Sequence, residues 1–132
     1  MRPASLASFI AIGTYGCSAV VRRLGLPAVW NQGVAFSSFG DRSSLAVGIG
    51  FVALSILSAM VYEKSAYTRS GIIMLWGGAL GNLMDRLLYG SVMDYIPVPF
   101  WPGGLYVNVA DLAIMLGCIY LIQGFYGAKE AE

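Results

Sequence analysis

The chain has 132 residues, of which 58% are hydrophobic and 11% charged, and its formal net charge is +1. Soluble domains usually carry about 25% charged residues, so this composition predicts an integral membrane protein made of one domain. Lys and Arg are scattered along the chain rather than clustered, which excludes a nucleic-acid partner. The chain contains no histidine, which excludes Ser-His-Asp catalysis.

An uncharged run from Pro3 to Val21 predicts the first membrane-spanning helix, at about residues 4–22. A cleaved signal peptide is the competing interpretation, because Thr14-Tyr15-Gly16-Cys17 resembles a poor lipoprotein cleavage box. We favour the helix, since position 14 of that box is polar and position 15 is bulky.

The following segment, residues 24–42, is predicted to be an irregular connection because glycine and proline punctuate it. Trp30 within it suits a membrane interface. Asn31 and Gly33 are residue types that favour turns.

Three further helices are expected at about residues 43–62, 70–89 and 105–126. Prolines between the last two forbid a helix, so residues 94–104 are predicted to be a loop or short strand. The fold class is therefore an all-α membrane protein with four transmembrane helices and a small extracytoplasmic loop or strand region. The Lys and Arg distribution leans weakly towards both termini being cytoplasmic.

The third predicted helix carries an unusual set of polar and small residues. Residues three or four apart share a helix face, which places Gly78, Asn82, Asp85 and Tyr89 together. Gly77 and Gly81 on a neighbouring face form a small-xxx-small pair, which lets another helix approach closely. Polar groups at this depth should face a protein interior or a wet cavity.

Two carboxylates, Asp94 and Asp111, flank the link between the third and fourth helices, and residues 95–110 between them carry no charge. Antiparallel neighbouring helices would bring the two side chains to one level. Close carboxylates share a proton, so one can activate a water while the other donates a hydrogen bond to a scissile carbonyl. This is aspartic-protease chemistry, which needs no metal or cofactor.

Other interpretations stay open at this point. Each Asp could cap a helix or pair with Arg86, and Arg86 could orient the site by reaching Asn82 or a loop carbonyl. Asp85 is adjacent to Arg86 and points away from it on a helix, so it is not expected to pair with Arg86 or to join the dyad. Membrane carboxylates also form proton or cation pathways, so a small conducting protein is the alternative function, and a structural membrane subunit is a third.

Four blocks of the sequence resemble signal peptidase II, the bacterial prolipoprotein signal peptidase. They are Asn31-Gln32-Gly33-Val34-Ala35-Phe36, Gly77-Gly78-Ala79-Leu80-Gly81-Asn82-Leu83-Met84-Asp85-Arg86, Val92-Met93-Asp94-Tyr95 and Asn108-Val109-Ala110-Asp111. They occur in the family's order, and the resemblance covers about residues 18–120.

The resemblance implies an intramembrane aspartyl endopeptidase of the bacterial cytoplasmic membrane, with its active site at the extracytoplasmic face. Its substrates would be prolipoproteins carrying a diacylglyceryl-cysteine, cut just before that cysteine, and globomycin-type antibiotics would inhibit it. Asp94 and Asp111 match the catalytic dyad. The residues that match the site-lining and substrate-positioning set are Asn31, Gly33, Asn82, Arg86 and Asn108.

The chain departs from the family pattern in two places. The family's first helix usually ends in Asp-Gln-x-x-Lys, whereas here the corresponding positions are Ser18 and Arg22, so the basic residue is kept and the acid is lost. The segment from Arg22 to Asn31 is also shorter than usual, which should affect substrate grip and pocket closure more than the chemistry.

Overall fold

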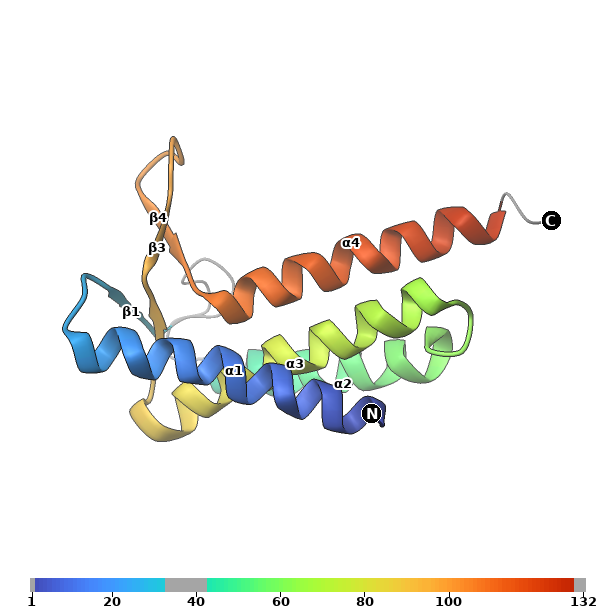
Figure 1. Cartoon of the computed structure of the whole chain (residues 1–132), viewed down its shortest axis with the longest axis horizontal. Coiled ribbons are helices and arrows are strands. Elements are labelled where there is room, and N and C mark those ends of the chain that lie inside the picture. Colours follow the sequence, from blue (N-terminus) through green and yellow to red (C-terminus); the bar gives the residue numbers. More distant parts are fainter. Residues whose placement is uncertain (1, 33–42, 130–132) are drawn as a thin grey trace.

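A computed structural model describes residues 2–32 and 43–129. The helices α1 (Pro3–Leu24), α2 (Ser43–Val61), α3 (Ala66–Tyr89) and α4 (Val109–Lys129) lie side by side. Short strands gather at one end of these helices, and the described chain ends lie at the other (Figure 1). The predicted class, an all-α membrane protein with a small strand region, is confirmed.

Within the described part of the chain, two helices are long and apolar enough to cross a membrane, α1 over its whole length and α4 from Val109 to Gly127. The apolar part of α2 is shorter, from Ala46 to Val61. Many large apolar side chains on α1, α2 and α4 are exposed, as expected of surfaces that face lipid rather than water.

The third helix begins four residues before the predicted start. Ser65 is its N-cap, and the Ser65 hydroxyl accepts a hydrogen bond from the Thr68 backbone N–H. In return, the Thr68 hydroxyl accepts one from the Ser65 backbone N–H. Arg69, which the sequence analysis placed before the helix, instead lies within it and pairs with Glu63 at 3.3 Å. At the other end Gly90 adopts φ 73°, a left-handed conformation that glycine takes without a steric penalty.

The fourth helix begins later than predicted, at Val109 rather than residue 105. Residues Leu105–Val107 form a strand, β4, that pairs antiparallel with β3, Ile96–Val98, with Ile96 opposite Val107. The helical prediction for residues 105–108 is therefore wrong. Asp111 consequently lies in the first turn of α4.

A second strand pair joins distant parts of the chain. Strand β1, Val29–Asn31, pairs antiparallel with β2, Val92–Asp94, with Asn31 opposite Val92. The prediction of an irregular connection is wrong for these three residues. The pairing brings the end of the α1 connection beside the exit of α3.

Helix α3 packs between α1 and α4 through glycines. A Cβ at Gly77 would lie 2.6 Å from the Cβ of Ile10 on α1, and one at Gly81 would clash with Thr14. The predicted close approach of a helix at Gly77 and Gly81 is therefore confirmed. Gly78 faces the other way, where a Cβ would lie 2.5 Å from the Ala110 carbonyl oxygen at the start of α4.

Candidate active site

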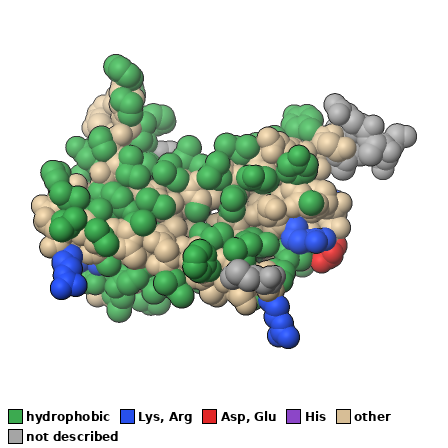
Figure 2. All heavy atoms as spheres, viewed as in Figure 1, with side chains coloured by type: hydrophobic (Ala, Val, Ile, Leu, Met, Phe, Trp, Pro, Cys, Tyr) green, Lys and Arg blue, Asp and Glu red, His purple; other side chains and the backbone are tan. Residues whose placement is uncertain are grey.

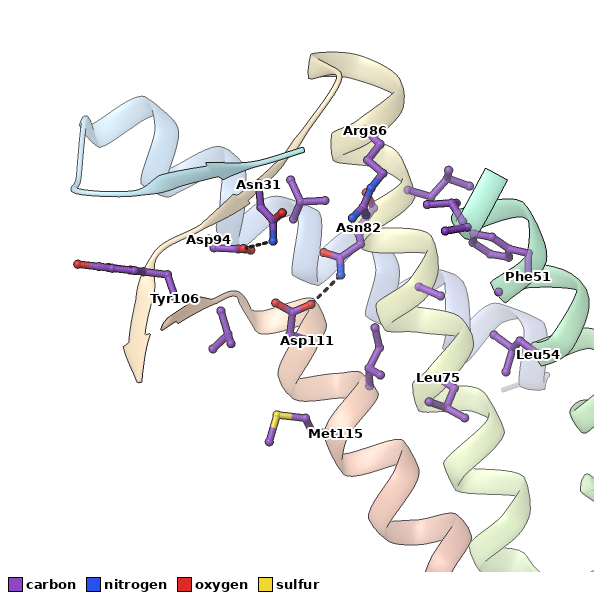
Figure 3. Close-up of a pocket in the computed structure, with 18 of the residues that line it drawn as sticks. Asn31, Phe51, Leu54, Leu75, Asn82, Arg86, Asp94, Tyr106, Asp111 and Met115 are labelled. Atoms are coloured by element: carbon purple, nitrogen blue, oxygen red, sulfur yellow. Dashed lines mark hydrogen bonds between the residues drawn. The ribbon is translucent and has the colours of Figure 1, made fainter. Parts of the chain in front are cut away.

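A cavity of about 460 Å³ opens between α2, α3 and α4 at the strand end of the molecule. Its polar lining comes from Asn31, Asn82, Arg86, Asp94 and Asp111, which Figure 3 shows at the upper end. Leu54, Leu75 and Met115 form apolar walls below them, and Phe51 of α2 lies across the cavity at the level of Asn82. The cavity therefore combines one polar end with a long apolar part.

Asp94 ends strand β2 and is almost completely buried, with 4% of its surface exposed. Its Oδ2 accepts a hydrogen bond from Asn31 Nδ2 at 3.0 Å, and its Oδ1 accepts one from Asn108 Nδ2 at 2.9 Å. Burial raises the pKa of Asp94 to about 6, and the Asp111 carboxylate adds to this rise, while the two amide donors and Arg86 oppose it. Asp94 is thus a carboxyl that holds a proton more readily than an exposed one.

Asp111 is held by its own helix terminus. The Asp111 backbone N–H donates to Asn108 Oδ1, and the Asn108 backbone N–H donates to Asp111 Oδ2, each at 3.0 Å. This reciprocal pair is a capping box, so the alternative that Asp111 caps a helix is also correct. The second oxygen, Oδ1, accepts from Asn82 Nδ2 at 2.8 Å and lines the cavity (Figure 3).

Asn108 links the two carboxylates and is 1% exposed. Its Nδ2 donates both to Asp94 Oδ1 and to Asn82 Oδ1, the latter at 3.0 Å. Since Asn82 in turn donates to Asp111, a continuous chain of hydrogen bonds connects the two acids. The predicted meeting of Asp94 and Asp111 at one end of the helices, beside Asn82 and Asn108, is observed.

Arg86 Nη1 donates to the Asn82 backbone carbonyl at 3.4 Å, one turn back along α3. The side chain lines the cavity, and its charge lowers the pKa of Asp94. This is one of the positions that the sequence analysis offered for Arg86. Gly33, the remaining predicted site residue, lies outside the described residues.

An ion pair that was not predicted from the sequence lies behind the site. Arg22 Nη2 lies 3.1 Å from Asp85 Oδ1, and Asp85 Oδ2 accepts the backbone N–H of Met93 at 3.3 Å. The Arg22 guanidinium also lies 3.7 Å from the centroid of the Tyr89 ring. Asp85 therefore ties α1 and α3 to the strand that presents Asp94. Arg22, the basic residue at the end of the first helix, was the feature of the sequence that could have indicated this ion pair.

A family model and curated relatives identify the same family. A family model described as signal peptidase (SPase) II matches residues 7–126. The chain is 38% identical over 99 residues to the lipoprotein signal peptidase of Moorella thermoacetica, covering 73% of this chain and 64% of that one. It is 34% identical over 117 residues to the lipoprotein signal peptidase of Pelagibacter ubique, covering 83% and 70%.

Two solved structures, each described as a bacterial membrane enzyme, share the fold. The first has a TM-score of 0.80 at 21% identity and covers 98% of this chain and 90% of that one. The second has a TM-score of 0.76 at 22% identity, with coverage of 93% and 91%. The match to the Moorella relative spans just under two thirds of that relative's length.

Proposed function

Because the chain belongs to the signal peptidase II family, we propose that it removes signal peptides from lipoprotein precursors. The substrate would be a precursor whose cysteine carries a diacylglyceryl group, and the cut would fall just before that cysteine. The shape of the cavity supports this substrate class. Its polar end can hold the peptide bond, and its apolar walls can accept hydrocarbon chains or apolar side chains.

The observation that carries the proposal is the pair of acids joined through the buried side chain of Asn108 at the polar end of an apolar cavity. Asp94, whose pKa is raised by burial, holds the shared proton and donates a hydrogen bond to the scissile carbonyl oxygen. Asp111 accepts a proton from a water molecule, whose oxygen attacks the carbonyl carbon. The C–N bond then breaks as Asp111 passes the proton it took from water to the leaving amine of the lipidated cysteine, and the proton on the carbonyl oxygen returns to Asp94.

The neighbouring residues position this pair. Asn82 orients Asp111, while Asn31 and Asn108 orient Asp94. Arg86 lies close enough to stabilise negative charge that develops in the transition state. Gly33 is proposed to line the same site on the basis of the family pattern. The chemistry assigned to these residues uses no metal or cofactor.

A proton or cation pathway fits the structure less well. Conduction requires polar groups distributed through the depth of the membrane. The polar lining of this cavity gathers at one end, whereas Leu54, Leu75 and Met115 line the part farther from the strands. The family assignment likewise gives no support to conduction.

The proposed setting is the bacterial cytoplasmic membrane, with both termini in the cytoplasm and the dyad at the extracytoplasmic face. A translocated precursor would present its lipidated cysteine at that face. A reporter fused after Glu132 should then be active only in the cytoplasm. Periplasmic activity of the fusion would reverse the assigned face.

The dyad is tested by cleavage of a diacylglyceryl-modified lipobox peptide with purified protein. Asp94→Asn and Asp111→Asn should each lower the rate by about 10²-fold or more. The double variant should be little slower, because residues that act as one unit are not additive. Globomycin should block the wild-type reaction, and EDTA should leave it unchanged. Retention of more than about a tenth of the rate by a folded single variant, against the loss expected for an acid–base group, would contradict the aspartyl mechanism.

A further inference from the structure

The tip of the β3–β4 hairpin exposes two large aromatic side chains. Phe100 is fully exposed, at 101% of its reference surface, and Trp101 is 50% exposed. Phe100 also adopts φ 65°, a left-handed conformation that is unfavourable for a bulky residue. An exposed aromatic at a position that would suit glycine indicates that the side chain has a partner.

The hairpin runs across the helix axes rather than along them. Figure 1 shows it rising on the α4 side of the bundle, at the strand end, with its tip farther out than α4. Figure 2 shows hydrophobic side chains at the top of this projection. Because the helices cross the membrane, a hairpin that runs across them lies along the membrane plane, beside the level of the site.

The absence of charge on the hairpin and the apolar surface of α4 beside it indicate what the hairpin tip contacts. Residues 95–110 carry no charged side chain, which would be unusual for a water-exposed projection. On α4, Leu112 and Leu116 are exposed at 39% and 46% and lie outside the cavity lining, as expected of a lipid-facing surface. The hairpin tip therefore extends over the lipid that surrounds α4. Tryptophan at such a position is typical of a membrane interface, where the ring is apolar and its N–H stays hydrated.

We infer that Phe100 and Trp101 anchor the hairpin in the headgroup region of the bilayer beside α4. This contact is separate from the catalytic proposal, although it uses the same membrane orientation. It also affects the site, because β3 begins two residues after Asp94 and β4 ends one residue before Asn108. A hairpin held at the membrane surface fixes the two backbone segments that carry the dyad.

The test uses the full chain in nanodiscs made with phosphatidylcholine whose acyl chains are brominated either near the headgroup or near the chain end. The fluorescence of Trp101 is obtained as the difference between the wild type and Trp101→Phe. Bromine near the headgroup should quench this difference signal more strongly than deep bromine. Aqueous acrylamide should quench it weakly.

Phe100 supplies the matched variants, which share the same backbone conformation. Phe100→Leu keeps an apolar side chain and should retain the lipid quenching, whereas Phe100→Ser should lose most of it and gain acrylamide quenching. Quenching of wild-type Trp101 by acrylamide but not by bromolipid would overturn the inference. Lipid quenching that appears only after a lipobox peptide is added would also overturn it and assign the tip to the substrate. These quenching measurements do not depend on peptide cleavage, so they test the membrane contact even if the proposed function is wrong.

Discussion

Replacing Asp94 by Asn should stabilise the protein at high pH while abolishing its proposed chemistry. Burial raises the pKa of Asp94 from 3.8 to about 6, so the folded state binds this proton more tightly than the unfolded state does. Fold stability is therefore greatest below the unfolded pKa, falls as pH rises between the two values, and stays reduced above about pH 6. Because Asn carries no charge at any pH, the Asn variant does not lose stability in this way as pH rises.

The stability gained by Asp94→Asn can be calculated from the pKa shift of Asp94. A difference of about two pKa units corresponds to roughly 3 kcal/mol at pH 8, as an upper value. Against it, the new amide nitrogen cannot accept a hydrogen bond, so either Asn31 or Asn108 loses its acceptor at a cost of about 1 kcal/mol. We expect a net stabilisation of up to about 2 kcal/mol at pH 8 that disappears or reverses near pH 4.

The measurement is thermal unfolding in detergent, followed by tryptophan emission at both pH values. Glu63→Gln is the matched control, because the Glu63 side chain is 80% exposed and should change stability little at either pH. A destabilisation of the Asn variant that is equal at pH 4 and pH 8 would refute the reasoning. It would show that the amide hydrogen bonds, and not the cost of the buried charge, dominate at this position.

Other substitutions probe the packing and the support of the site. Gly78→Ala should cost about 1–3 kcal/mol through overpacking against α4, whereas Gly48→Ala on α2, where a Cβ meets nothing within 4 Å, should be neutral or stabilising in the same melts. Asp85→Asn should lower stability by roughly 2 kcal/mol by weakening a buried ion pair yet slow peptide cleavage less than the dyad substitutions; an equal loss of rate would place Asp85 in the chemistry. Ser18→Asp should leave expression and cleavage rate intact, because the Tyr95 hydroxyl beside Ser18 and Arg22 one turn along α1 can offset the cost of a buried carboxylate, and loss of folded protein would contradict that.

The polar centre could be predicted because it depends on local chain geometry. Helical spacing placed Asn82 on a buried face of α3, and a short link between antiparallel helices brought Asp94 and Asp111 to one level. The pairing of Asn31 with Asp94 could not be predicted from the residues alone. It depends on a strand pair between segments 63 residues apart, and three-residue strands leave no periodic signal.

The errors in helix boundaries have identifiable causes. The apolar run 105–107 fits a strand or a helix equally well, and its partner β3 decides the outcome. At the other boundary, the capping box of α3 uses Thr68 where Glu or Gln is the usual residue, so its signal was weak. The ion pair between Arg22 and Asp85 was missed because side chains from different helices meet only in the folded chain.

Asn108 shows how tightly the fold and the proposed chemistry are coupled here. Its amide nitrogen donates to Asp94 and Asn82, while its carbonyl oxygen accepts the backbone N–H of Asp111. An aspartate would lack the two donors, a serine could supply only one, and a glutamine would be longer than the cap geometry allows. The residue that lies between the hairpin and α4 therefore also links the two acids. Any movement of the α4 terminus would change the geometry proposed for proton sharing, so the close α3–α4 contact at Gly78 matters to the proposed site as well as to stability.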